Sequence, residues 1–131
     1  MKKMLAISLV ALGGACVPAE PIGLSPAEQA EFAEATRGYT AGPATNCVNL
    51  RDIRGNRSIG EGVILFEGLG NALYVNRPAA GCPEVRPGRT LVTRTSSGQL
   101  CRGDIATVVD PVSGIEYGGC GLGDFIPYRR Q

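Results

Sequence analysis

Short runs of β-branched, aromatic and other apolar residues alternate with turn residues from Asn46 to the end of the chain. This spacing is typical of β-strands joined by hairpins, rather than of strands that alternate with helices. Gly, Asn and Pro in segments 67–71 and 110–114 indicate the clearest hairpin turns. The pattern predicts six strands and a final extended segment, at 47–54, 62–67, 72–76, 90–95, 105–110, 115–120 and 125–128.

Several of these runs are apolar at consecutive positions, for example Val63-Ile64-Leu65-Phe66. A flat sheet with one face in water would alternate apolar and polar residues, whereas a closed sheet also hides its edge strands. The expected fold is therefore mainly β: a small six-stranded antiparallel barrel or barrel-like sheet, with one N-terminal helix and two disulfides.

One helix is predicted before the strands. Ser25-Pro26-Ala27-Glu28 has the pattern of a capping box with Pro at the first helical position, and Gly38 supplies a left-handed stop. Most apolar residues in between are Ala, which bury little area. We therefore expect this helix to lie outside the barrel or to space the domain from a membrane.

The N-terminus indicates export. Lys2 and Lys3 precede an apolar run to Ala15, a pattern typical of a secretory signal peptide and too short to span a bilayer permanently. The sequence Leu-Gly-Gly-Ala-Cys at 12–16 resembles the lipobox of bacterial lipoproteins, although the Leu lies four residues before Cys16 rather than three. The predicted organisation is a signal peptide at 1–15, a tether at 16–24, the helix region at 25–38 and the β domain at 39–131.

Two processing routes stay open for this N-terminus. Lipidation of Cys16 would anchor the chain in a membrane. Because Val17 stands where lipoproteins of the inner membrane commonly carry Asp, the outer membrane, facing the periplasm, is favoured. Cleavage after Ala19 would instead release a soluble periplasmic protein.

Four further cysteines lie in the body of the chain, and their even number predicts two disulfides in an oxidising compartment. Sequence alone permits three pairings. A nested arrangement, Cys47 with Cys120 and Cys82 with Cys101, is expected because a bridge from the first strand to the last hairpin would close the barrel.

Charge and composition exclude several classes of function. Without Lys2 and Lys3 the chain has 11 basic residues, all Arg, against 12 acidic ones, so a nucleic-acid partner is poorly supported. There is no His, which removes the commonest general base and metal ligand. Four acids, Asp104, Asp110, Glu116 and Asp124, lack the spacing of an EF-hand. No metal or cofactor is therefore expected.

Arginines are the best candidates for a functional surface. Arg51, Arg54 and Arg57 lie close together in sequence, and strands could bring Arg77, Arg86, Arg89 and Arg94 near them. Guanidinium groups bind phosphate or carboxylate bidentately, so an anionic envelope lipid or glycan is a candidate partner. Neighbouring acids such as Asp52 and Glu67 could equally neutralise these arginines in ordinary surface pairs.

Three segments carry a resemblance, namely Cys-Val-Asn-Leu-Arg-Asp-Ile-Arg at 47–54, Leu-Cys-Arg-Gly-Asp-Ile at 100–105 and Cys-Gly-Leu-Gly-Asp-Phe at 120–125. Together they are similar to a family of short exported proteobacterial proteins of unknown function, over about residues 42–127. The resemblance implies an envelope location and a shared β domain with cysteines. It brings no catalytic residues.

A second, shorter resemblance concerns Ser113-Gly114-Ile115-Glu116-Tyr117, which is similar to the Ser-Gly-x-x-Tyr motif of periplasmic C-type lysozyme inhibitors. Those inhibitors are also small exported barrels. Their second motif, with its Lys-Gly, is missing, because the only Lys residues lie in the signal peptide. A turn followed by an inward Tyr explains the same residues.

The expected function is a non-catalytic envelope lipoprotein, or a periplasmic binding or structural module, that binds another envelope component through its loops. A small inhibitor or ligand-binding protein similar to the lysozyme inhibitors is one alternative. A hydrolase is the other, and it would need a pair of carboxylates such as Asp104 with Asp124. No nucleophile with an adjacent base is visible in the sequence.

Overall fold

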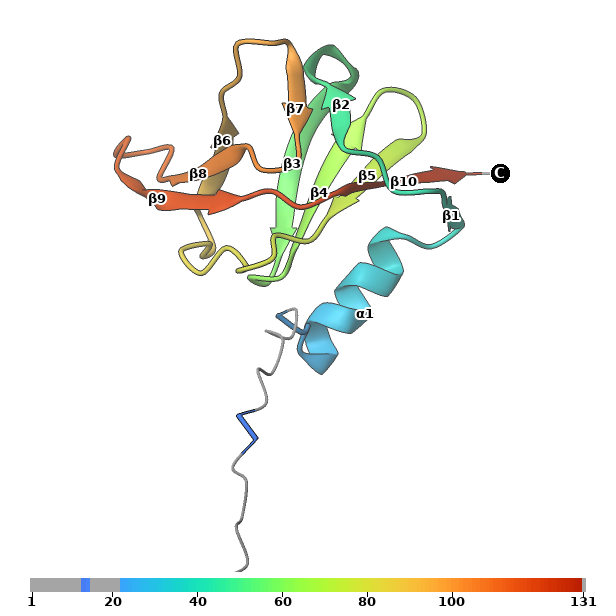
Figure 1. Cartoon of the computed structure of the whole chain (residues 1–131), viewed down its shortest axis with the longest axis horizontal. Helices are drawn as coiled ribbons and strands as arrows, with labels where there is room; N and C mark the ends of the chain where they lie inside the picture. The colour runs from blue at the N-terminus through green and yellow to red at the C-terminus, as the bar shows by residue number, and fades with distance from the viewer. Residues whose placement is uncertain (1–12, 15–21, 131) are drawn as a thin grey trace, which may run out of the picture.

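The computed structural model describes residues 13–14 and 22–130. Over these residues the chain forms two helices and ten strands arranged in three sheets (Figure 1). The helices are α1 (Pro26–Ala35) and the 3-10 helix η1 (Leu50–Asp52). The strands are β1 (Tyr39–Ala41), β2 (Cys47–Asn49), β3 (Ile53–Ile59), β4 (Val63–Gly68), β5 (Ala72–Asn76), β6 (Thr90–Thr93), β7 (Gln99–Cys101), β8 (Ile105–Val109), β9 (Glu116–Gly121) and β10 (Phe125–Arg130). The prediction of a mainly β protein with one N-terminal α-helix is confirmed.

The largest of the three sheets has five antiparallel strands in the order β1-β10-β5-β4-β3. β3, β4 and β5 follow one another as hairpins, and β10 lies between β5 and β1 (Figure 1). The strand that follows the helix and the final strand are therefore direct neighbours. β1 and β3 form the two edges of this sheet.

Both faces of the five-stranded sheet are covered by apolar side chains. Ile64 and Phe66 belong to one buried cluster, whereas Val63 and Leu65 belong to another. Successive side chains of a strand point to opposite faces, so an uninterrupted apolar run is expected wherever both faces are packed. The continuous run in β4 is thus explained by two coverings and needs no barrel.

Different elements cover the two faces. On one face, residues of β2, β6, β7, β8 and β9 pack against β4 and β10; the buried members of this cluster are Val48, Ile64, Phe66, Cys82, Leu91, Leu100, Ala106, Val108, Cys120, Leu122 and Phe125. On the other face, Leu24, Phe32 and Ala35 from the α1 region pack against the second cluster. The Phe32 and Tyr128 rings meet there edge to face, with centroids 6.4 Å apart.

Helix α1 begins at the predicted capping box. Ser25 Oγ accepts a hydrogen bond from the Glu28 backbone N–H at 3.2 Å, and the Glu28 carboxylate accepts one from the Ser25 N–H at 2.8 Å. No residue of α1 is fully buried, so the helix lies on the outside of the sheet as expected. Gly38, with φ 78°, follows its end in the left-handed conformation.

The predicted six-stranded barrel is wrong. The sheets are open and contain five, three and two strands, with the smaller ones ordered β6-β8-β9 and β2-β7. The predicted strand 47–54 is split by η1, so that β2 pairs with β7 while β3 pairs with β4. β1, β2 and β7 have only three residues each, too few to show an alternating pattern.

Candidate functional site

A groove of about 580 Å³ lies between β3 and the loop that leads into β6, beside the first turns of α1. The Asn56 side-chain amide donates to the Leu91 carbonyl oxygen at 3.2 Å and so ties β3 to β6 within this groove. The groove is lined by Glu28, Glu31, Asn56, Arg57, Ser58, Gly60, Glu61, Val85, Arg86, Pro87, Gly88, Arg89, Thr90 and Leu91. The groove is therefore lined by both acidic and basic side chains.

Each groove arginine lies close to an acidic side chain. Arg57 Nη1 is 3.7 Å from Glu31 and its Nε is 3.5 Å from Glu67. The pairs Arg86–Glu61, at 3.5 Å, and Arg89–Glu84, at 3.2 Å, complete the set. Exposed pairs of this kind contribute little to stability, but they neutralise the wall of the groove. The groove is therefore poorly suited to concentrate anions.

Arg89 holds the loop before β6 in place. Its guanidinium carbon lies 3.5 Å from the centre of the Tyr117 ring, and Nη1 donates to the Glu84 carbonyl oxygen at 2.8 Å. Its side chain is 22 % exposed. Arg86 also donates to carbonyl oxygens of this loop, those of Pro83 and Val85. Both side chains are used to shape the loop.

The structure separates the three arginines predicted as an anion-binding set. Only Arg57 lines the groove, and it is already paired with acids on α1 and β4. Arg51 in η1 and Arg54 in β3 are exposed, and within residues 22–130 neither forms an ion pair. The more distant candidates are also engaged: Arg77 lies over the Phe32 ring and Arg94 pairs with Glu116.

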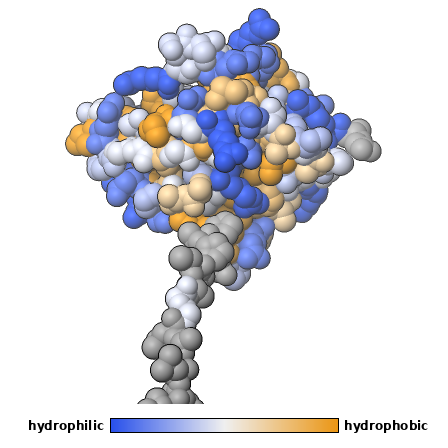
Figure 2. Space-filling view, viewed as in Figure 1, coloured by the Kyte–Doolittle hydropathy of each residue, from blue (hydrophilic) through white to orange (hydrophobic). Residues whose placement is uncertain are grey.

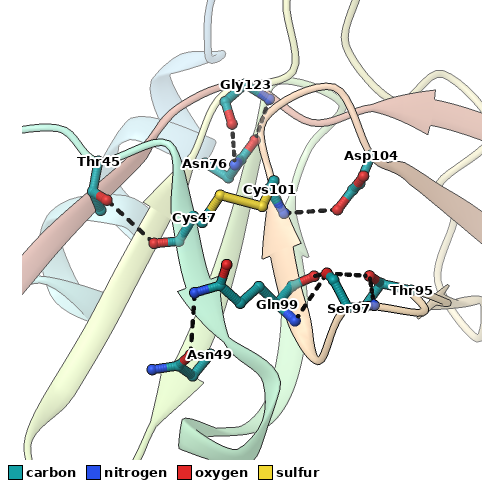
Figure 3. The surroundings of a disulfide bond; sticks show 10 residues. All are labelled: Thr45, Cys47, Asn49, Asn76, Thr95, Ser97, Gln99, Cys101, Asp104 and Gly123. Atoms are coloured by element: carbon teal, nitrogen blue, oxygen red, sulfur yellow. Dashed lines mark hydrogen bonds between the residues drawn. A yellow bond between two sulfur atoms is a disulfide. The ribbon is translucent and has the colours of Figure 1, made fainter.

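The cysteines form two disulfides, but not in the predicted nested arrangement. Cys47 is bonded to Cys101 and Cys82 to Cys120, so the bridges cross in sequence. Cys47 and Cys101 are direct partners in the β2–β7 register, and Figure 3 shows the bond between these strands. The nested prediction assumed a closed barrel with Cys47 and Cys120 at its seam. In the open fold those two residues belong to different sheets.

A buried amide connects the β9–β10 segment to the five-stranded sheet. Asn76 is 0 % exposed, and its side chain forms two hydrogen bonds with the backbone of Gly123. The Asn76 amide donates to the Gly123 carbonyl oxygen at 2.8 Å, and its Oδ1 accepts from the Gly123 N–H at 2.9 Å (Figure 3). Sequence reasoning missed this pair, because the two residues are 47 positions apart.

The β8–β9 turn is ordered by Asp110. Its carboxylate accepts hydrogen bonds from the backbone N–H groups of Val112, at 2.8 Å, and Ser113, at 3.2 Å. These two bonds, the Val112 bond first, hold the pKa of Asp110 below its ordinary value. The motif similar to that of lysozyme inhibitors begins in this turn, yet Ser113 Oγ accepts from the Ile115 N–H and Tyr117 packs against the core. A local turn bond and core packing thus account for both side chains without an enzyme target.

Of the two carboxylates considered for hydrolysis, that of Asp104 has a local structural role, whereas the buried Oδ1 of Asp124 forms no hydrogen bond within the described residues. Asp104 Oδ2 accepts a hydrogen bond from the Cys101 N–H at 2.7 Å (Figure 3), and Asp124 Oδ1 is 3.5 Å from Arg102 Nη1. Across residues 13–14 and 22–130, no three Cys, Asp or Glu side chains gather so that they could hold a metal ion.

Exposed apolar side chains are dispersed over several elements. The large ones are Ile22, Leu69, Ile105, Val112 and Ile115, and Val112 at the β8–β9 turn is the most exposed at 95 %. On the face shown in Figure 2, hydrophilic residues predominate and hydrophobic residues form small separate spots. Isolated exposed apolar residues are normal on soluble surfaces.

A second cleft, of about 380 Å³, lies where the β4–β5 turn meets β10. It is lined by Asp52, Leu69, Asn71, Ala72, Tyr74, Arg129 and Arg130. Arg129 and Arg130 were not among the predicted site residues, since they follow the last predicted strand and belong to no motif. Their position at the end of an apolar strand beside Tyr128 was the available signal.

The predicted signal peptide and the lipid-attachment residue Cys16 lie outside the described residues, apart from positions 13 and 14. Among the helices of the described part, none has the length and apolar character needed to cross a membrane. The signal peptide and the lipidation of Cys16 therefore stay predictions.

No protein-family model, no curated protein and no solved structure matches this chain.

Proposed function

We propose that this protein is a non-catalytic binding module of the bacterial cell envelope, exported and then anchored to the outer membrane through a lipid on Cys16. The observation that carries the proposal is the pairing of all four cysteines within residues 22–130 in two disulfides. Stable disulfides of this kind belong to oxidising compartments such as the periplasm.

The start of the continuous described segment, at Ile22, supports a tethered arrangement. Ile22 packs so closely on the β3–β4 turn and the loop before Cys82 that Gly62 and Gly81 have no space for a Cβ: one at Gly62 would lie 2.7 Å from the Ile22 carbonyl oxygen. Cys16 precedes Ile22 by six residues, which reach at most about 20 Å when fully extended. An anchor at Cys16 would hold this surface near the membrane.

The engaged state of the polar side chains supports a binding role over a catalytic one. Asp104 is bonded to the backbone, and Arg57, Arg86 and Arg89 are paired with acids. The groups that stay available are exposed arginines such as Arg51 and Arg54. Contact with an anionic glycan or lipid of the envelope is the interaction that such groups favour.

The anchor is tested by intact-mass analysis of the membrane fraction, with a Cys16→Ser variant as the matched control. We expect a chain that begins at Cys16 and carries a diacylglyceryl group and an acyl group, whereas the variant moves to the soluble fraction. Recovery of an unmodified soluble chain that begins at Glu20 would contradict the anchored form and leave a secreted periplasmic protein.

A further inference from the structure

The floor of the larger groove is the free edge of a strand. Three consecutive residues of β3 line it, Asn56, Arg57 and Ser58, together with Gly60 in the following turn. Because successive side chains of a strand point to opposite faces, a space that touches three consecutive residues lies along the strand edge. Within residues 22–130, β3 pairs with β4 alone, and the backbone groups of these three residues bond to no other element. The groups that point away from β4 are therefore open to another strand.

The elements that cover the two faces of the sheet form the walls of the groove. Asn56 lies opposite Phe66, on the face of the first buried cluster, and its side chain reaches the Leu91 carbonyl oxygen of β6. Arg57 points to the opposite face, where its Nη1 lies 3.7 Å from Glu31 of α1. A strand added beside β3 would thus continue the sheet between two coverings that are already in place.

The two walls differ in their chemistry. On the α1 side, Glu28 and Glu31 line the groove, and α1 contains no basic residue. Arg57 balances Glu31, whereas Glu28 forms no ion pair within residues 22–130. On the other side, Val85 and Pro87 supply apolar surface, and the arginines of that loop are engaged with acids and loop carbonyl oxygens. An added strand would meet negative charge on one face and apolar surface on the other.

We propose that an extended segment of a partner protein binds in this groove as an additional strand beside β3, with basic side chains toward α1 and apolar side chains toward the loop before β6. In such strand addition, main-chain hydrogen bonds supply affinity and alternate side chains supply specificity. The lining from residue 56 to residue 60 corresponds to about 13 Å of extended chain, so about five residues of the partner fit. This inference rests on the binding role proposed above and names the partner's chemistry, but it does not depend on lipidation.

The test is an NMR titration of the full mature chain, oxidised and carrying Cys16→Ser so that anchoring plays no part. The probe is the peptide Lys-Val-Lys-Val-Lys, blocked at both ends. We expect saturable shifts of the backbone amides at Asn56, Arg57 and Ser58, and slower hydrogen exchange at one or more of them.

Three comparison peptides separate strand pairing from general charge. The first is Glu-Val-Glu-Val-Glu, which should bind about tenfold more weakly or less, because it places acids against α1. The other two are the basic peptide methylated on the backbone nitrogens of either its Lys or its Val residues. Because alternate N–H groups of a strand point to the same neighbour, at least one methylated form should bind about tenfold more weakly than the parent.

Variants of α1 provide a matched control on the protein. Glu31→Gln should weaken binding of the basic peptide about threefold, the size expected for an exposed charge pair. Glu34→Gln removes the same charge three residues further along α1; Glu34 pairs with Arg37 and does not line the groove, so affinity should be unchanged. Circular dichroism of each variant checks that the fold is retained.

Three results would overturn the inference: equal binding of the acidic peptide, binding of both methylated peptides as tight as that of the parent, or no saturable shift at residues 56–58. An equal loss of affinity with Glu34→Gln and Glu31→Gln would do the same, because it would reflect general charge. So would concentration-dependent protection of these amides without peptide, which would show a second copy on the edge. A correct lipid mass on Cys16 combined with any of these results would leave the anchoring proposal intact.

Discussion

Replacing Asn76 by Ala tests whether a single buried amide holds the β9–β10 segment against the sheet. Asn76 is completely buried, and both of its side-chain hydrogen bonds go to Gly123, at 2.8 and 2.9 Å. In the alanine variant the Gly123 N–H and C=O lose these partners. A Cβ at Gly123 would lie 2.5 Å from the Arg77 carbonyl oxygen, so the segment is packed too tightly to move easily to new partners.

The magnitude follows from the cost of unsatisfied polar groups. A backbone group left without a partner costs about 1–3 kcal/mol when it is buried, and because Gly123 is half-buried we take the lower part of that range, about 3 kcal/mol for the two groups together. A domain of this size has a free energy of unfolding of about 5–15 kcal/mol, of which the loss is a large fraction. With a urea m-value of about 1.5 kcal/mol/M, the midpoint should fall by about 2 M.

Equilibrium unfolding in urea, followed by far-ultraviolet circular dichroism, measures this change. Asn46→Ala is the matched control, because Asn46 is exposed and its side chain forms no hydrogen bond within residues 22–130. The control should change the free energy of unfolding by less than about 0.5 kcal/mol. A loss below about 1 kcal/mol for Asn76→Ala would refute the role assigned to the amide.

Asn76→Asp gives the same site a pH dependence. A protonated carboxyl group can make both bonds to Gly123, whereas burial disfavours the ionised form and raises the carboxyl pKa above its unfolded value of about 3.9. The stability of the variant is therefore retained below about pH 4 and is lost as pH rises toward the higher folded pKa. Equal destabilisation at pH 3.5 and pH 7, after subtraction of the wild-type change, would contradict this mechanism.

Two further predictions concern the crossed disulfides and the β8–β9 turn. The bridges Cys47–Cys101 and Cys82–Cys120 close loops of 54 and 38 residues, each stabilising by about 4 kcal/mol on the chain-entropy model. Cys82 and Cys120 are buried, so replacing both by Ala also removes buried side-chain atoms. This double variant should therefore unfold at a lower urea concentration than the variant with Ala at Cys47 and Cys101. The opposite order of urea midpoints would contradict this prediction. Carbon-13 NMR should show that the Asp110 carboxyl titrates with a pKa below its unfolded value. The stabilisation that Asp110 gives the folded state is then present above the unfolded pKa and is lost as pH falls through the lowered, folded pKa. An unshifted titration would contradict the turn geometry.

Local signals in the sequence were sufficient for the helix start, for most strands and for the presence of two disulfides. The capping box at Ser25 depends on neighbours three residues apart, and the strand β5 was predicted with its observed bounds. Such features depend on short-range hydrogen bonding, turn conformations and period-two patterning, all of which can be read within a few residues. The even number of body cysteines likewise needed no geometry.

Pairings between distant segments were decided only by the tertiary structure. The apolar run in β4 is compatible with either a barrel or an open sheet covered on both faces. The structure shows the open sheet, because α1 packs on one of its faces and the smaller sheets pack on the other. Cysteine partners follow from strand register, because Cys47 lies opposite Cys101, and this register is absent from any local pattern. The same holds for Arg57, whose acidic partners come from α1 and β4, and for Arg129, which meets Tyr74 across neighbouring strands. The sequence alone thus determines which residues can form strands, caps and bridges, whereas packing determines which of them meet, since contact energies depend on neighbours that the chain brings together only on folding.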